Sequence, residues 1–251
     1  MKIPPHLPAA LLAGLSLAVT TPAALASPTD AFSAVYTVRK SGLPLGDAHF
    51  SLKPGKQDGC YVYAGHAQPN ALVHMFLGNI DDETRFCVVD GDVRPEYFRH
   101  HIDGKPGHSY TLHFDWSAMT VHYKSENGDS RTYTLKPGTQ DPMSLQIAAR
   151  RWLASAGGGS TLPTAHRFIL ADDDGLQTYK VHVSDAGNLK TPGGTFDTVK
   201  LARTGTHHHA LTFWLARNAD WIPVQVRRLE DGDTQYVLTV QSLSRSDATG
   251  Q

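Results

Sequence analysis

Apolar residues recur at every second position through most of this chain, and clusters of Gly, Pro, Asp and Asn interrupt them at short intervals. Residues two apart on a β-strand lie on the same face of the sheet, so this pattern predicts short strands with one apolar face. The tight turns between them favour antiparallel pairing. The clearest runs are Ala34, Tyr36 and Val38; Tyr110, Leu112 and Phe114; and Tyr236, Leu238 and Val240.

About a dozen such strands follow one another along the chain. A sheet with that many strands curls instead of staying flat. The sequence therefore predicts a mainly β fold, either a strongly curved antiparallel sheet or a partly open β-barrel. The concave side of such a sheet is apolar. It can be filled by side chains or can hold a ligand, and the sequence is equally compatible with both alternatives.

Two segments have helical spacing. Asp141 and Pro142 are suited to the N-cap and the first position of a helix. The apolar residues that follow predict one central amphipathic helix through Ala154; they are Leu145, Ala148, Ala149, Trp152 and Leu153. A second, short helix is expected over residues 70–77.

A run of small residues, Gly157 to Ser160, follows the central helix. Gly-rich and Ser-rich segments are flexible, so residues 155–161 are expected to form an internal joint. Neither group of strands offers an obvious closed core alone, and residues 27–251 are therefore predicted to form a single β-rich domain. The alternative is a division into two domains at this joint.

The N-terminal residues have the order of a secretory signal peptide: a basic start at Lys2, an apolar core from Ala9 to Val19, and a small-residue end. Residues 1–26 are predicted to be removed by cleavage after Ala26. The apolar core is shorter than the ~20 residues that a membrane-spanning helix needs. The mature protein is therefore expected to be exported, soluble and not membrane-spanning. The alternative, a buried N-terminal helix, is opposed by four prolines in this segment.

Charge and cysteine content narrow the possible partners of the protein and its redox compartment. With 23 basic and 24 acidic side chains the net charge is -1, so no strong field would attract nucleic acid, and no nucleic-acid partner is expected. Only two cysteines occur, Cys60 and Cys87, each within a strand-like run. In an oxidising compartment they are expected to form one disulfide between neighbouring strands. A redox-active pair is disfavoured because the Cys-x-x-Cys spacing is absent.

No sequence motif typical of catalysis occurs, so no catalytic residue, cofactor or metal ligand is predicted. Residues His207 to His209 and Asp172 to Asp174 are the two densest clusters of possible metal ligands. Neighbouring residues of a strand point to opposite faces, and the aspartates lack the spacing of a calcium loop. Both clusters are interpreted as hairpin tips, with metal binding by the histidines left as the alternative.

Several short motifs in a fixed order resemble the domain of unknown function 3108 family of exported Gram-negative bacterial proteins. These motifs are Tyr36-Thr-Val with Gly42 and Gly46, Asp141-Pro-Met-Ser-Leu145, Thr191-Pro-Gly-Gly-Thr-Phe196, Val199-Lys-Leu201, Phe213-Trp-Leu215 and Ile222-Pro-Val224. The resemblance covers nearly the whole mature chain. It implies a periplasmic location and a fold like the unclosed barrels of the lipoprotein carriers LolA and LolB, and it implies no catalytic residues.

These observations together favour a non-enzymatic periplasmic protein that binds a lipid, an acyl chain or a glycolipid inside the curved sheet. The alternative is a scaffold with a filled core that contacts an envelope protein through exposed strand edges. An enzyme acting on a polysaccharide is a third possibility and would need two carboxylates converging in a cleft.

Overall fold

The structure is a computed structural model that describes residues 27–71, 74, 78–156, 162–203, 209–230 and 233–245. Within these ranges the chain forms fifteen strands, one α-helix and two short 3-10 helices. The expected mainly β architecture is confirmed. The predicted signal peptide, most of the expected helix over 70–77, and His207 and His208 lie outside the described residues.

The strands of the first half form one continuous antiparallel meander. They are β1 (Phe32–Lys40), β2 (Leu43–Pro54), β3 (Cys60–Pro69), β4 (Ile80–Val89), β5 (Asp92–Ile102), β6 (Tyr110–Asp115), β7 (Thr120–Ser125) and β8 (Ser130–Thr134). The 3-10 helix η1 (Pro106–His108) lies between β5 and β6.

The second half contributes the remaining elements. They are β9 (Thr139–Gln140), the helix α2 (Ser144–Ala156), β10 (Ala165–Asp172), β11 (Gly175–Thr191), β12 (Gly194–Arg203), β13 (His209–Ala216), η2 (Arg217–Ala219), β14 (Ile222–Glu230) and β15 (Asp233–Arg245). All neighbouring strands are antiparallel except β9 and β10, which are parallel.

A single sheet carries all fifteen strands, in the order β8 to β1, then β15 down to β9. The two halves join where the first strand pairs with the last, and Phe32 lies opposite Arg245. The two edges of the sheet, β8 and β9, are therefore consecutive in sequence. Only residues 135–138 separate them.

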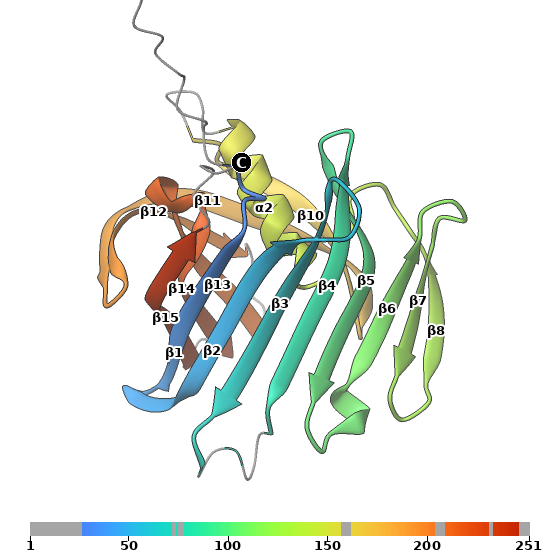
Figure 1. Cartoon of the computed structure of the whole chain (residues 1–251), viewed down its shortest axis with the longest axis horizontal. Coiled ribbons are helices and arrows are strands. Elements are labelled where there is room, and N and C mark those ends of the chain that lie inside the picture. The colour runs from blue at the N-terminus through green and yellow to red at the C-terminus, as the bar shows by residue number, and fades with distance from the viewer. Residues whose placement is uncertain are drawn as a thin grey trace, which may run out of the picture.

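This short connection requires the sheet to curl. Fifteen strands laid flat at a spacing of about 4.8 Å would be about 67 Å wide. Four connecting residues span less than about 20 Å even when extended. The edges must therefore approach each other, and the side chain of Gln140 in β9 donates a hydrogen bond of 2.8 Å to the backbone oxygen of Val93 in β5. Figure 1 shows β10 to β12 passing behind the first meander, with α2 between the two layers.

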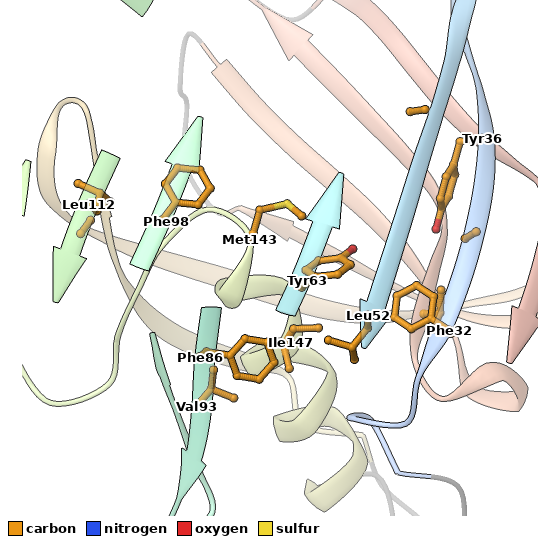
Figure 2. Packing of buried hydrophobic residues seen from close by; sticks show 14 of the residues in the cluster. Phe32, Tyr36, Leu52, Tyr63, Phe86, Val93, Phe98, Leu112, Met143 and Ile147 are labelled. Atoms are coloured by element: carbon orange, nitrogen blue, oxygen red, sulfur yellow. The ribbon is translucent and has the colours of Figure 1, made fainter. Parts of the chain in front are cut away.

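The core lies on the concave side of the sheet, around α2. Inward residues of the first meander pack against the N-terminal half of the helix, where Met143 and Ile147 face Tyr63, Phe86 and Phe98 (Figure 2). A second apolar cluster joins Ala149 and Leu153 to the inner face of β10 to β13. The alternation in the sequence thus identifies the face that is buried.

The central helix differs from the expectation at its end. It continues to Ala156, so Ser155 and Ala156 belong to the helix and not to a flexible joint. The hydroxyl of Ser155 donates to the backbone oxygen of Trp152, three residues earlier in the same helix, at 2.9 Å. The rest of the predicted joint, residues 157–161, lies outside the part of the chain that the structure describes.

Candidate binding site: an apolar cavity beside the central helix

A cavity of about 270 Å³ lies between α2 and the inner face of strands β10 to β14. Its wall is mostly apolar. The helix side contributes Pro142, Leu145, Gln146 and Ala149, and the strands contribute Phe168, Leu170, Tyr179, Val181, Leu201, Arg203, Ala210, Leu211, Phe213, Leu215, Pro223 and Arg228. The concave face is therefore not completely filled.

Strand register brings the strand residues of this wall together. Phe168 lies opposite Tyr179, Leu201 opposite Phe213, and Leu211 opposite Arg228. Residues opposite each other in an antiparallel sheet share a face, so alternating residues from five strands form one continuous surface. The period-two pattern of the sequence produces this surface directly.

Asp141 fixes the start of the helix that forms the other wall. Its Oδ1 accepts the backbone N–H groups of Met143 and Ser144, both at 2.8 Å, and the Ser144 hydroxyl accepts the N–H of Asp141 in return. Its Oδ2 accepts the hydroxyl of Thr84 at 2.7 Å. Burial raises the pKa of the Asp141 carboxyl to about 6, and these hydrogen bonds oppose the rise. The expected N-cap is confirmed.

Among the described residues that line the cavity, two are charged, Arg203 and Arg228. The guanidinium carbon of Arg203 lies 3.9 Å from the centre of the Tyr179 ring. Arg228 donates to the hydroxyl of Tyr236 at 3.4 Å. Burial raises the pKa of Asp172, near the end of β10, to about 6, while Arg203 exerts a smaller, lowering effect. The cavity is therefore apolar with a basic rim.

A buried polar cluster adjoins the cavity through Gln146 and Pro223. Gln146 accepts a hydrogen bond of 3.2 Å from the hydroxyl of Tyr63, and the backbone oxygen of Pro223 accepts the hydroxyl of Tyr36. Arg150 lies beside both tyrosines and is 1 % exposed. Burial lowers the pKa of Arg150 to about 10 and raises the pKa of both tyrosines.

A second space of about 510 Å³ lies between α2, the start of β5, the segment around β9 and the strand β10, and it shares Phe168 with the apolar cavity. It is lined more heavily by polar groups, among them Asp92, Gln140 and Arg151. Trp152 also lines it and stacks on His166 with ring centres 4.5 Å apart. No tryptophan of the described residues lines the apolar cavity, whose aromatic residues are Phe168, Tyr179 and Phe213.

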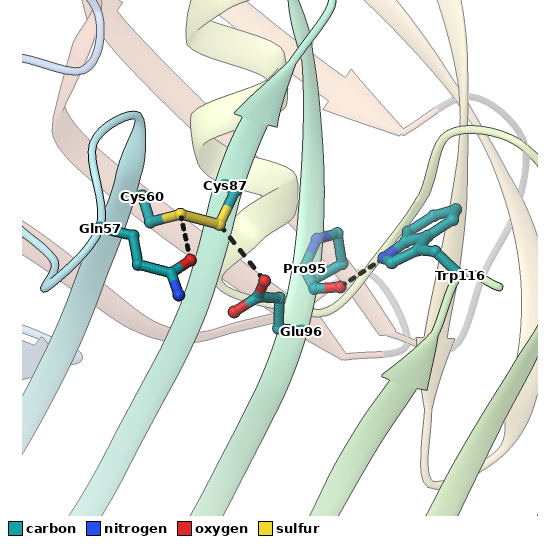
Figure 3. The surroundings of a disulfide bond; sticks show 6 residues. All are labelled: Gln57, Cys60, Cys87, Pro95, Glu96 and Trp116. Carbon is teal, nitrogen blue, oxygen red and sulfur yellow. Dashed lines mark hydrogen bonds between the residues drawn. A yellow bond between two sulfur atoms is a disulfide. The ribbon is translucent and has the colours of Figure 1, made fainter.

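The structure contains the expected disulfide between Cys60 and Cys87, which lie opposite each other in β3 and β4. The neighbouring residues Tyr61 and Phe86 stack on the concave side, so the bridge lies on the outer face. Figure 3 shows it beside Glu96, whose Oε1 is 3.3 Å from the sulfur of Cys87. The disulfide is therefore separate from the cavity.

The other sequence candidates lie outside the cavity wall. Asp173 and Asp174 form the turn between β10 and β11, as expected, and their carboxylates cluster with that of Asp172. His113 and His122 are exposed. His100 points inward, and its Nδ1 lies 2.6 Å from a carboxylate oxygen of Asp82. Burial lowers the pKa of His100, but the hydrogen bond and charge of Asp82 outweigh this effect and raise it.

Sequence reasoning missed the two rim arginines, although a signal for them exists. Arg203 continues the inward series Val199 and Leu201, and Arg228 continues the series Val224 and Val226. A basic residue in phase with the buried positions of its strand is a candidate for a cavity wall.

Comparisons with known proteins place the fold. A β-barrel-like protein of domain of unknown function DUF1849 from Brucella abortus is similar, with 14 % identity and a TM-score of 0.51 over 88 % of this chain and 100 % of that one. MucB is matched with 10 % identity and a TM-score of 0.36 over 90 % of this chain and 56 % of that one. No curated protein matches the sequence. The likeness to LolA and LolB stays a prediction.

Among the described residues, no helix is both long and apolar enough to cross a bilayer. The family model described as "Protein of unknown function (DUF3108)" matches residues 34–239, which is most of the sequence. The fold around the apolar cavity, from β1 into β15, lies within this match, and the chain belongs to the DUF3108 family.

Proposed function

We propose that this protein is a non-catalytic periplasmic binder of a hydrophobic or amphipathic envelope component, which it holds by an acyl chain between α2 and the curved sheet. The supporting observation is the apolar cavity of about 270 Å³. Ligand sites are typically concave, mostly apolar and furnished with a few polar groups, and this cavity has those properties.

The size and chemistry of the cavity favour one acyl chain. Its volume of about 270 Å³ lies just below the roughly 300–1,000 Å³ that is usual for small-molecule sites. Each buried methylene contributes about 0.8 kcal/mol, so a chain of moderate length gains enough free energy for binding. Leu211, which is 44 % exposed, marks where the apolar surface reaches solvent.

The periplasmic setting rests on two features. The N-terminal sequence has the order of a signal peptide with cleavage after Ala26, and disulfides persist mainly in oxidising compartments. The Cys60–Cys87 bridge suits such a compartment.

The test is to purify the protein from its native periplasm, extract it with organic solvent and identify what is released by mass spectrometry. A stoichiometric acyl-chain compound supports the proposal. Protein that is free of such a compound, and that binds no acyl-chain probe after purification, contradicts it.

A scaffold role is the second candidate, because β8 is an edge strand whose residues are mostly exposed. An exposed edge can accept a strand from another protein. Cross-linking in intact cells separates the two proposals: a stoichiometric protein partner at β8 without bound lipid favours the scaffold.

A further inference from the structure

We infer that the cavity selects anionic amphiphiles, with a carboxylate or phosphate head held by Arg203 and Arg228 and a single acyl chain inside. This inference deepens the proposed function and rests on it. It adds the charge of the ligand, its orientation and the two residues that recognise it.

The positions of the two arginines in the sheet support this inference. Both line the cavity, one on β12 and one on β14. Leu211 of β13 lies between them: it is opposite Arg228 in the register, and continuing the pairing of Leu201 with Phe213 by two residues places it beside Arg203. The two arginines therefore project from strands on either side of the exposed leucine, on the same face of the sheet.

The guanidinium groups of Arg203 and Arg228 also keep hydrogen-bonding capacity for a ligand. In the same half of the sheet, Arg217 is held by Asp185 and Asp197, and Arg245 by Asp220. Within the described ranges, no carboxylate oxygen lies within 4.0 Å of Arg203 or Arg228. Arg203 lies over the Tyr179 ring, a contact that uses the face of the guanidinium and not its N–H edge. Arg228 donates one hydrogen bond of 3.4 Å, to the neutral hydroxyl of Tyr236, so its charge has no carboxylate counterpart among the described residues.

The chemistry of the guanidinium group determines which ligand heads fit this arrangement. A planar guanidinium donates paired hydrogen bonds to a carboxylate or a phosphate, and such charge-assisted bonds are stronger than neutral ones. A cationic head would meet repulsion from both arginines. With the head at the rim, the chain extends along Phe213 and Leu201 towards Ala149 on the helix.

The experiment compares ten-carbon probes that differ in their heads, measured by isothermal titration on delipidated protein below the micelle concentration of each probe. The probes are decanoate, decyl phosphate, decanol and decyltrimethylammonium. We expect the two anions to bind at least about tenfold more tightly than decanol, and the cation to bind most weakly. The stronger of the two anions identifies whether a carboxylate or a phosphate head is preferred.

Variants test the residues. Arg203→Gln combined with Arg228→Gln is expected to reduce the affinity for the preferred anion at least about tenfold and to leave decanol binding unchanged. Retained decanol binding also shows that the variant is folded. The matched control is Arg227→Gln, because Arg227 neighbours Arg228 on the same strand but lies over Trp214 on the opposite face. The control should bind all four probes like the original protein.

The outcomes separate the two proposals. If no probe binds, the proposed function itself fails. If decanol binds as tightly as the anions, or if the double variant keeps its preference for anions, the cavity still binds chains but the selection by Arg203 and Arg228 is wrong. If Arg227→Gln weakens anion binding as much as the double variant, the effect is one of overall charge and the inference is also wrong.

Discussion

At the scale of single residues, Asp141 carries two roles that conflict. Its carboxylate caps α2 and accepts the hydroxyl of Thr84, yet it is fully buried, and burial disfavours its charge. The capping bonds need only an acceptor oxygen, which an asparagine also supplies. The charge itself is therefore a cost of this position and not a requirement of the cap.

Replacement of Asp141 by asparagine is expected to change how stability depends on pH. The pKa of this carboxyl is raised to about 6 in the folded protein from an unfolded value of 3.8, so the folded state binds the proton more tightly. The group favours folding below pH 3.8, and this contribution is lost as the pH rises to about 6. The loss amounts to about 3 kcal/mol, at about 1.4 kcal/mol per pKa unit.

Urea denaturation of both proteins at pH 4.5 and pH 7.5 measures this effect. The free energy of unfolding of Asp141→Asn minus that of the original protein should be larger at pH 7.5 than at pH 4.5, because only the original protein loses stability between these two pH values. An unchanged difference between the two pH values would show that the carboxyl has no raised pKa.

Residue identities could be predicted from the sequence only where a local signal exists. Asp141 was recognisable because an N-cap followed by proline is a local pattern. The cavity wall was not, because its residues come from five strands and the helix, and no local pattern shows which strands lie against which. Arg203 and Arg228 can be found in the sequence only by searching for charged residues that share the alternation of the buried face of their strand.

At the scale of elements, α2 forms one wall of the cavity, and a larger side chain on it should close the cavity. Ala149 is 4 % exposed and lines the space directly. Ala149→Phe is expected to abolish binding of decanol and decanoate alike, because the ring occupies the volume that the chain needs. The far-ultraviolet circular dichroism should stay that of the original sheet, and probe binding by a folded variant would place the ligand elsewhere.

The disulfide stabilises the pairing of β3 with β4 from the outer face. Cys60 and Cys87 are 27 residues apart, and in the chain-entropy model a bridge closing a loop of this length contributes about 3 to 4 kcal/mol. The double replacement by serine should lower the urea midpoint accordingly while leaving affinity for acyl-chain probes unchanged. A large loss of affinity would show that the bridge supports the cavity as well as the fold.

Regular elements were well predicted where alternation extends over several residues, as in β1, β6 and β15. The two-residue strand β9 is too short to show an alternation of apolar residues. It forms because the chain runs beside β10 just before it enters α2, and the two strands pair there. The helix end was placed two residues early because glycines follow it, while Ser155 stabilises the last turn.

At the scale of the whole molecule, one sheet joins the first and last strands. β15 lies between β1 and β14, so a chain that ends at residue 232 would expose two strand edges in the middle of the sheet. Such edges promote aggregation. The shortened chain is expected to be insoluble or unfolded, whereas a chain that ends at Arg245 keeps all the described strands and should unfold like the full-length protein. Calorimetry and gel filtration of both chains test this, and a folded, monomeric shorter chain would contradict it.

The curvature of the sheet was predictable from the number of strands, but the strand order was not. The pairing of Phe32 with Arg245 joins residues at opposite ends of the sequence, and no local pattern indicates such a contact. A single domain over residues 27–251 stays a prediction. It requires one calorimetric transition for the unfolding of the mature protein.

The position of β15 also constrains the order in which the protein can acquire its structure. During synthesis the N-terminal strand appears first, and it must wait for the last residues before it gains its second neighbour. A nascent polypeptide with this topology cannot complete its sheet until β15 has emerged from the ribosome. Until then one edge of β1 stays unpaired, so this edge is open to wrong pairing with other strands while the chain is being made.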